Sequence, residues 1–182
     1  MYNNDKVMAL LTEEELQQVS SYAVTCARLS LPIFEARNPL DQRPKEAIAE
    51  AEAFAAGKRR TASLRATAWS ALAVARELGD IPAAHAAYAA SHAAASAYLH
   101  PIASSHQIKH ILGSAIHMII AFELDALYDA EVGNERIRWA VSMANSTVRD
   151  VLRRYPPPRK GRGRFSELFC YLDTQLRKPE DR

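Results

Sequence analysis

The chain has 182 residues, a length typical of one domain that can bury its own core without disulfides or metals. The chain has only six glycines and nine prolines, whereas alanine, leucine, glutamate and arginine are abundant. This composition favours helix and predicts an all-α fold. The net charge of +2 is too small to require nucleic acid or an anionic membrane as a partner.

The sequence also excludes secreted and membrane-spanning classes of protein. The two cysteines, Cys26 and Cys170, form neither a disulfide framework nor a zinc spacing. Residues 1–11 lack the features of a signal peptide, and the most apolar stretch, residues 111–122, is shorter than the ~20 residues that span a bilayer. We therefore expect a cytoplasmic protein with no membrane segment.

Four helices are predicted in the first half of the chain, each opened by a residue that can cap it. The expected N-caps are Thr12 (in a capping box with Glu15), Asp41, Thr61 or Ser63, and Asp80. The first helix runs to about Glu35, and Gly57 and Gly79 end the second and third. In the fourth, ten of the fifteen residues from 83 to 97 are alanine, so that neighbouring backbones can approach closely.

Three more helices are predicted in the second half. The fifth, about residues 105–129, is apolar on almost every side, as a central buried helix would be. Gly133 and Asn134 separate it from a sixth helix over about 135–155, and a last amphipathic helix covers 165–176. The prediction is one domain over residues 12–177, a bundle of about seven helices around segment 105–129, with a disordered or loosely ordered N-terminus at 1–11 and a tail at 178–182.

All six histidines fall in the region 85–117. His106, His110 and His117 are spaced so as to share one face of the predicted fifth helix. Imidazoles so placed can bind a metal, but nearby carboxylates come only well downstream. We therefore expect no metal and no cofactor.

A second set of large side chains follows helical spacing on the alanine-rich helix. His85, Tyr88 and His92 either fill the space that the alanines leave or line a groove against the fifth helix. A polar groove inside a bundle can hold a small ligand. The alternative function for this chain is therefore small-molecule binding or catalysis through the histidine-rich region 85–117.

Complete catalytic motifs are absent from the sequence. It contains no Gly-x-Ser-x-Gly, no paired cysteines, no phosphate-binding glycine-rich loop and no dinucleotide fingerprint. We expect a protein that acts by binding and is not an enzyme.

A basic stretch covers residues 149–164, with seven Arg or Lys and one acidic residue. Arg159, Lys160 and Arg162 make its end a candidate basic contact surface. Tyr155 is its sole aromatic residue, whereas single-strand binders interleave basic and stacking side chains, so the pattern disfavours nucleic acid. Exposed apolar positions on the first and last helices leave room for a homodimer.

Several motifs along the chain resemble those of a known family. They are Cys26-Ala27 with Leu31-Pro32-Ile33-Phe34-Glu35, Asp41-Gln42-Arg43-Pro44 with Ala47-Ile48, Arg65-Ala66 with Ala68-Trp69, Ala97-Tyr98-Leu99-His100-Pro101, and Gln107-Ile108-Lys109-His110-Ile111-Leu112-Gly113. They resemble a family of putative immunity proteins linked to bacterial polymorphic-toxin systems, over about residues 15 to 176. The resemblance implies an α-helical domain that binds and neutralises a cognate toxin protein in the cytoplasm.

Five polar residues of these motifs stand in otherwise apolar helical or cap contexts: Arg43, Arg65, His100, Gln107 and His110. Two hypotheses stay open for them. They form a hydrogen-bonded network that fixes the turns between helices, since an unpaired buried polar group costs ~1–3 kcal/mol, or they line the binding site. Immunity proteins that block nucleases are often strongly acidic, and this chain is not, so a nuclease partner is not indicated.

Overall fold

The computed structural model describes residues 8–179, along which it places eight α-helices and one short 3₁₀ turn. These are α1 (Glu13–Glu35), α2 (Arg43–Ala55), α3 (Ala62–Glu77), α4 (Ile81–Ser96), η1 (Ser105–Gln107), α5 (Ile108–Asp125), α6 (Ala130–Met143), α7 (Ser146–Arg153) and α8 (Arg164–Arg177). Within residues 8–179 the extended backbone is limited to one bridge, Met8 with Ile102, so the predicted all-α fold is confirmed.

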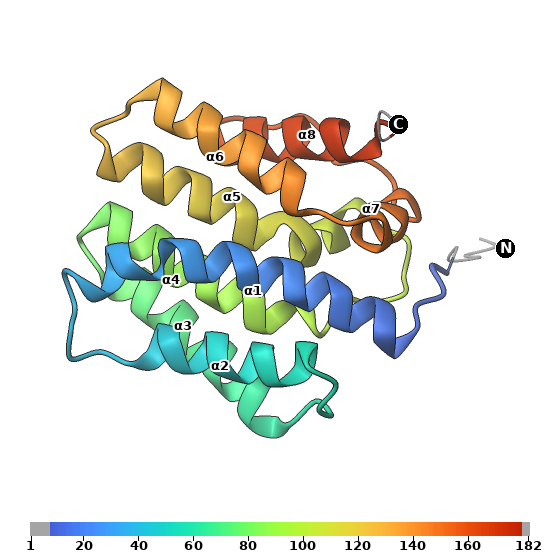
Figure 1. Ribbon diagram of the computed structural model, residues 1–182, viewed down its shortest axis with the longest axis horizontal. Helices are drawn as coiled ribbons and strands as arrows, with labels where there is room; N and C mark the ends of the chain where they lie inside the picture. Colours follow the sequence, from blue (N-terminus) through green and yellow to red (C-terminus); the bar gives the residue numbers. More distant parts are fainter. Residues whose placement is uncertain (1–7, 180–182) are drawn as a thin grey trace, which may run out of the picture.

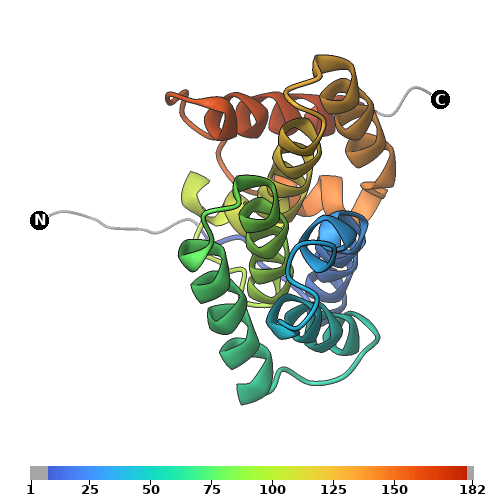
Figure 2. The same cartoon turned by 90° about the vertical axis from the view of Figure 1, so that its left-hand side faces the viewer.

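The centre of the bundle is formed by α4 and α5 together. Every residue from 111 to 121 on α5 is buried, which confirms the predicted central apolar helix. Helix α4 packs against α1, α2, α3 and α5, while α6 and α8 lie on the other side of α5 (Figures 1 and 2). Eight alanines on and just after α4 are fully buried: Ala83, Ala86, Ala87, Ala89, Ala90, Ala93, Ala94 and Ala97. Because alanine ends at Cβ, four helices can approach this one closely.

The predicted N-caps explain where three of the first four helices begin. The Thr12 hydroxyl accepts from the Glu15 backbone N–H at 3.1 Å, and the Glu15 carboxylate accepts from the Thr12 N–H at 2.9 Å, which completes the capping box. Thr61 and Asp80 cap α3 and α4 in the same way. Local hydrogen bonds of this kind depend only on residues within one turn, which is why the sequence predicts them.

The start of α2 differs from the prediction. Gln42 is the N-cap and makes no side-chain cap bond. The Asp41 carboxylate instead accepts from the Arg43 backbone N–H at 3.1 Å and from the Arg43 guanidinium at 2.7 Å. The Arg43 guanidinium offers the Asp41 carboxylate further donors, so Asp41 pairs with Arg43 and the helix begins one residue later than expected.

The single helix predicted over 135–155 is wrong: the structure has two helices there. Helix α6 ends where Ala144 adopts an extended conformation, and the Asn145 side chain accepts from the Val148 N–H at 3.0 Å to open α7. An asparagine oxygen competes well with the backbone carbonyls of a continuing helix, so it ends one helix and caps the next.

The predicted separation at Gly133 is also wrong, because Gly133 lies inside α6. The chain reverses earlier, at Leu127 and Tyr128, whose φ angles of 54° and 66° are left-handed. Gly133 is needed for close packing, since a Cβ there would collide with the Glu123 side chain, which pairs with Arg164. The glycine therefore marks a contact between α5 and α6 and not a turn.

Residues 8–11, which were expected to be loosely ordered, make defined contacts. Ala9 is buried and its N–H donates to the Pro101 carbonyl at 2.5 Å, while Arg154 donates to the Leu10 carbonyl at 2.6 Å. The rest of the expected N-terminal segment, residues 1–7, and residues 180–182 of the expected tail lie outside the described residues. No helix in the described stretch is both long enough and apolar enough to cross a membrane.

Candidate functional site

An open groove runs along α3, where that helix faces the end of α4 and the start of α5. Two adjoining hollows form it, one of about 600 Å³ and one of about 410 Å³. The first is lined by Arg60, Thr61, Ala62, Arg65, Ala66, Trp69 and Tyr98. The second is lined by Arg65, Ala68, Trp69, Leu72, Ser91, His92, Ala95, Tyr98, His106, Lys109 and His110. We call the whole the Trp69 groove.

The sequence of α3 places one face in the core and another in the groove. Leu64, Ala68, Ala71, Val74 and Ala75 are buried, and α3 packs through this face on α4. Arg65 and Trp69, one helical turn apart, fall on the exposed side. Helical spacing therefore delivers two large side chains to the same side of the groove.

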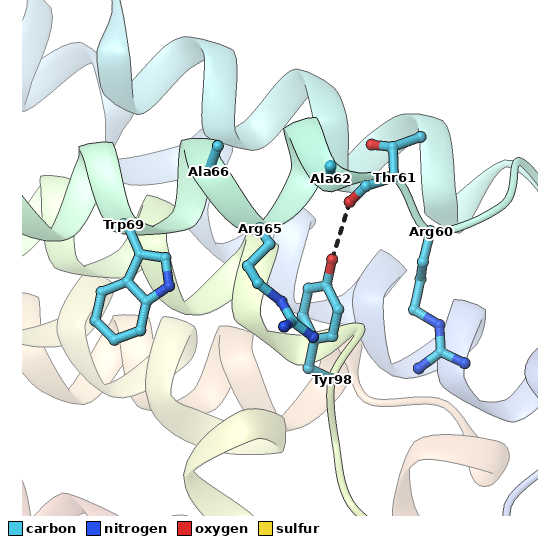
Figure 3. A pocket seen from close by; sticks show the side chains of 7 residues that line it. All are labelled: Arg60, Thr61, Ala62, Arg65, Ala66, Trp69 and Tyr98. Atoms are coloured by element: carbon cyan, nitrogen blue, oxygen red, sulfur yellow. Dashed lines mark hydrogen bonds between the residues drawn. The ribbon is translucent and has the colours of Figure 1, made fainter.

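Three side chains shared by both hollows define the centre of the groove. The Arg65 guanidinium carbon lies 4.6 Å from the Tyr98 ring centroid, a cation–π contact. The Tyr98 hydroxyl donates to the Thr61 carbonyl at 3.1 Å, which fixes the ring (Figure 3). Trp69 projects beside them with 62% of its surface exposed. An exposed tryptophan beside an arginine is the composition of hot spots in protein interfaces.

The groove is positively charged although the surrounding part of the chain is not. Residues 1–130 hold 11 Lys and Arg against 14 Asp and Glu. Among the described lining residues, however, the charged side chains are Arg60, Arg65 and Lys109, with no carboxylate. Arg60 is held in place by donating to the Ala97 carbonyl at 3.3 Å. The local excess of cations favours an anionic group in the groove.

His110 forms part of the inner wall of the groove. Its Nδ1 lies 2.9 Å from the Ala95 carbonyl, which can only accept, so Nδ1 carries the proton. Burial lowers the pKa of His110, although the hydrogen bond to Ala95 opposes this, so the ring is neutral at pH 7. In that tautomer Nε2 is left as an acceptor.

Behind the groove, four aromatic rings from α4 and α5 form a cluster in which His117 is buried and His85, Tyr88 and His92 are partly buried. His92 and Tyr88 both stack on His117, with centroid distances of 5.1 and 4.9 Å. The Nδ1 atoms of His85 and His117 are 2.9 Å apart, so one must donate and the other accept. Burial lowers the pKa of His92 to about 4, that of His117 well below its usual range, and that of His85. These histidines are neutral in the folded protein at pH 7.

His106, His110 and His117 were expected to share one face of a helix, but the structure does not bring the three side chains together. His106 lies in η1, outside the α-helix, and His117 belongs to the ring cluster. Only His106 and His110 reach the groove, together with His92. Among residues 8–179, no three His, Cys, Asp or Glu side chains are placed so that they could hold a metal ion.

Close packing of this cluster predicts the effect of a glycine substitution. A Cβ at Gly113 on α5 would lie 2.5–2.9 Å from three atoms of the His92 ring. We expect Gly113→Ala to lower the free energy of unfolding by about 2 kcal/mol, because overpacking outweighs the helix propensity of alanine. Urea titration measures this. Gly79→Ala is the matched control, since its Cβ meets nothing within 4 Å, and a loss at Gly79 equal to that at Gly113 would contradict the packing argument.

Of the five predicted site residues, the structure brings Arg65 and His110 together in the groove. The other three make contacts within the fold. Arg43 pairs with Asp41 and Glu77 at 2.7 and 3.3 Å, linking the start of α2 to the end of α3. The Gln107 side chain accepts from the His100 N–H at 3.0 Å, and the Tyr155 hydroxyl donates to the His100 carbonyl at 2.7 Å. Contacts of this kind support the network hypothesis for these three residues.

The candidate basic contact surface lies in the loop between α7 and α8. Arg159, Lys160 and Arg162 are exposed there and form no ion pair with residues 8–179. The other arginines of the stretch, Arg149, Arg153, Arg154 and Arg164, all contact the protein itself. The basic stretch is therefore mostly structural, and three residues of it remain available to a partner.

Four charged or aromatic residues of the groove were not predicted from the sequence as site residues: Arg60, Trp69, Tyr98 and Lys109. One signal was available for Trp69. It lies one turn after Arg65 and off the apolar stripe of the predicted third helix, where a large aromatic residue has no place in the core. The other three depend on contacts between helices that are distant in sequence.

Comparison with known proteins places the chain beside one family. The sequence model of the Imm-5 like putative immunity proteins matches residues 9–146. No curated protein and no solved structure matches the chain significantly. The matched span contains every residue of the Trp69 groove and ends at the start of α7, short of the expected limit near residue 176. Arg159, Lys160 and Arg162 lie outside it.

Proposed function

The chain belongs to the family of Imm-5 like putative immunity proteins, and on this basis we propose that it binds and neutralises a cognate toxin by direct protein–protein contact. It acts in the cytoplasm of a bacterial cell and catalyses no reaction. The observation that supports this proposal is the Trp69 groove, in which an exposed tryptophan stands beside an arginine already held against a tyrosine ring. Such side chains lose little freedom on binding and contribute a large share of interface energy.

The serine and threonine hydroxyls of the groove are engaged by the fold. Ser91 donates to the Ala68 carbonyl at 2.9 Å and so ties α4 to α3. The Thr61 hydroxyl accepts from the Leu64 N–H at 3.0 Å as the cap of α3 and donates to the Glu50 carboxylate of α2 at 3.2 Å. Both groups therefore stabilise the helices that form the groove, which supports binding over catalysis.

The proposal is tested by capture and rescue. A tagged chain is incubated at moderate salt with lysate of its source organism, and the bound protein is identified by mass spectrometry. We expect a stoichiometric partner that stops growth when expressed alone and is harmless when this chain is co-expressed. Trp69→Ala should weaken binding at least ~30-fold, because a central tryptophan contributes ~2 kcal/mol or more. Binding is measured by calorimetry.

Tyr171→Ala is the matched control, because Tyr171 is an aromatic residue on α8 with 50% of its surface exposed, outside the groove. Its affinity should stay within about twofold of the unmodified chain. Absence of any partner that the chain neutralises, even from cells that produce candidate toxins, would overturn the proposed function.

A second candidate function follows from the histidines of the inner hollow. His92, His106 and His110 line its volume of about 410 Å³, which lies within the range of small-molecule sites. A small-molecule-binding or catalytic role through region 85–117 is therefore the alternative. A thermal-shift screen separates it from the first, since only this alternative requires one compound to stabilise the chain through His110.

A further inference from the structure

We propose that the Trp69 groove binds an acidic segment of the partner protein, with an apolar side chain of that segment packed against Trp69. This inference rests on the proposed function and deepens it, because it states the chemistry of the partner and where it docks. Three observations carry it: unpaired cations in the groove, an apolar floor beside them, and a fixed central arginine.

The cations of the groove differ from most others in the chain. Arg28, Arg37, Arg43, Arg154, Arg164 and Arg177 each pair with a carboxylate of the protein itself. Arg65 and Lys109 form no ion pair with any described residue, and Arg60 contacts only a backbone carbonyl. In a chain with 23 basic and 21 acidic residues, three such cations along the two adjoining hollows of one groove form a site complementary to carboxylates.

The floor of the groove is apolar and made of small side chains. Ala68, Leu72 and Ala95 line the inner hollow, and Trp69 stands at its edge. A branched or aromatic side chain of a partner can fill this space and bury part of the indole surface. The occupant that matches both parts is a protein segment in which carboxylates alternate with at least one apolar residue.

The placement of Arg65 favours a carboxylate over the bases of a nucleic acid. Its guanidinium covers one face of the Tyr98 ring, so that face is closed to a stacking base. Among the Trp, Tyr and Phe residues that line the groove, Trp69 is then the one exposed ring, whereas single-strand binders stack successive bases on several. The guanidinium edge stays free for a two-point contact with a carboxylate.

The first test uses the partner identified by capture. Arg65→Glu and Lys109→Glu should each raise the Kd at least ~30-fold, with a larger loss for the double variant. Arg76→Glu is the control, because Arg76 is an exposed cation near the end of the same helix, outside the groove, and its reversal makes the same change in net charge. It should alter the Kd less than about threefold. Melting temperatures of all variants verify that they fold.

A cross-link then locates the docked segment. A photoreactive residue at Ala66, which lines the groove, should link to a partner segment rich in Asp and Glu. Reversing the nearest carboxylate of that segment to lysine should restore affinity to Arg65→Glu at least tenfold, as a direct charge pair requires.

The second test needs no partner. In Trp139→Phe, Trp69 is the sole tryptophan, so its fluorescence reports the groove. A synthetic peptide of alternating glutamate and leucine should change this fluorescence saturably, and Arg65→Glu should abolish the change. The same peptide with lysine in place of glutamate should have no effect.

The outcomes separate the two proposals. A chain that still neutralises its toxin with Arg65→Glu and Lys109→Glu at full affinity has its proposed function but not this docking site. A chain that neutralises nothing lacks the proposed function, and the peptide titration still decides the chemistry of the groove. Tighter binding of oligothymidylate than of the acidic peptide would overturn the inference in favour of nucleic acid.

Discussion

Lowering the pH from 7 to 4 is expected to decrease the free energy of unfolding by about 3 kcal/mol through His92 alone. Burial, with smaller contributions from the neighbouring His110 and Lys109, lowers the pKa of His92 to about 4 in the folded protein. The unfolded chain binds a proton near the usual pKa of 6.5. Between these two values the unfolded state holds more protons, so the stabilisation is present above pH 6.5 and is lost as the pH falls toward 4.

The other histidine rings of the cluster act in the same direction. The pKa values of His85 and His117 are also lowered by burial, and protonation of both would place two charges at Nδ1 atoms 2.9 Å apart. We therefore expect cooperative acid unfolding, with a slope of more than one proton below pH 6. A flat dependence of stability on pH between 7 and 5 would contradict this account.

Urea titrations at a series of pH values measure the effect. His92→Gln removes one titrating group and should reduce the pH slope between 6.5 and 4 by about one proton. Leu40→Gln is the control, because Leu40 is 95% exposed and carries no titrating group, so its slope should equal that of the unmodified chain. Equal slopes for the two variants would show that His92 is not the group responsible.

The second large effect concerns the buried guanidinium of Arg149. It donates to the carbonyls of Val141 at 2.9 Å, Ala144 at 3.0 Å and Leu176 at 3.4 Å, so it joins α7 to the C-terminal ends of α6 and α8. Arg149→Met keeps much of the side-chain volume and removes these bonds. We expect the free energy of unfolding to fall by about 3 kcal/mol, because buried acceptors lose a charged donor. Denaturant unfolding measures the loss.

Arg153→Met provides the comparison on the same helix. Arg153 is exposed and pairs with Asp150 at 2.7 Å. Exposed ion pairs contribute ~0–1 kcal/mol, so this variant should stay within that range. An effect of Arg149→Met no larger than that of Arg153→Met would show that α6, α7 and α8 are joined by apolar packing alone.

Helix starts could be predicted from the sequence where they depend on one turn of chain. Thr12, Thr61 and Asp80 cap helices as expected because each accepts from the backbone amide three residues further along. The break at Asn145 was missed because the apolar stripe continues across it on both α6 and α7. An apolar stripe shows which face of a segment is buried. It looks the same for one long helix and for two consecutive helices that pack on the same core.

The candidate site could be predicted only in part, for a related reason. Arg65 and His110 stand out as polar residues in apolar contexts, which a sequence shows directly. That they meet beside Trp69 and Lys109 depends on how α3, α4 and α5 cross, and no local pattern specifies this. His106 was expected on the same helix face as His110 and His117, whereas the 3₁₀ turn η1 holds it outside α5.

The buried alanines of α4 constrain the amino-acid sequence of the helical core, whereas the exposed side of α3 is under no such packing constraint. A side chain larger than alanine at any of their eight buried positions would push α1, α3 or α5 outward. Ala62, Ala66 and Trp69, on the outer side of α3, are exposed and support no core. Descendants of this chain can therefore exchange residues along that rim, and acquire a new partner, while the helical scaffold beneath is inherited unchanged.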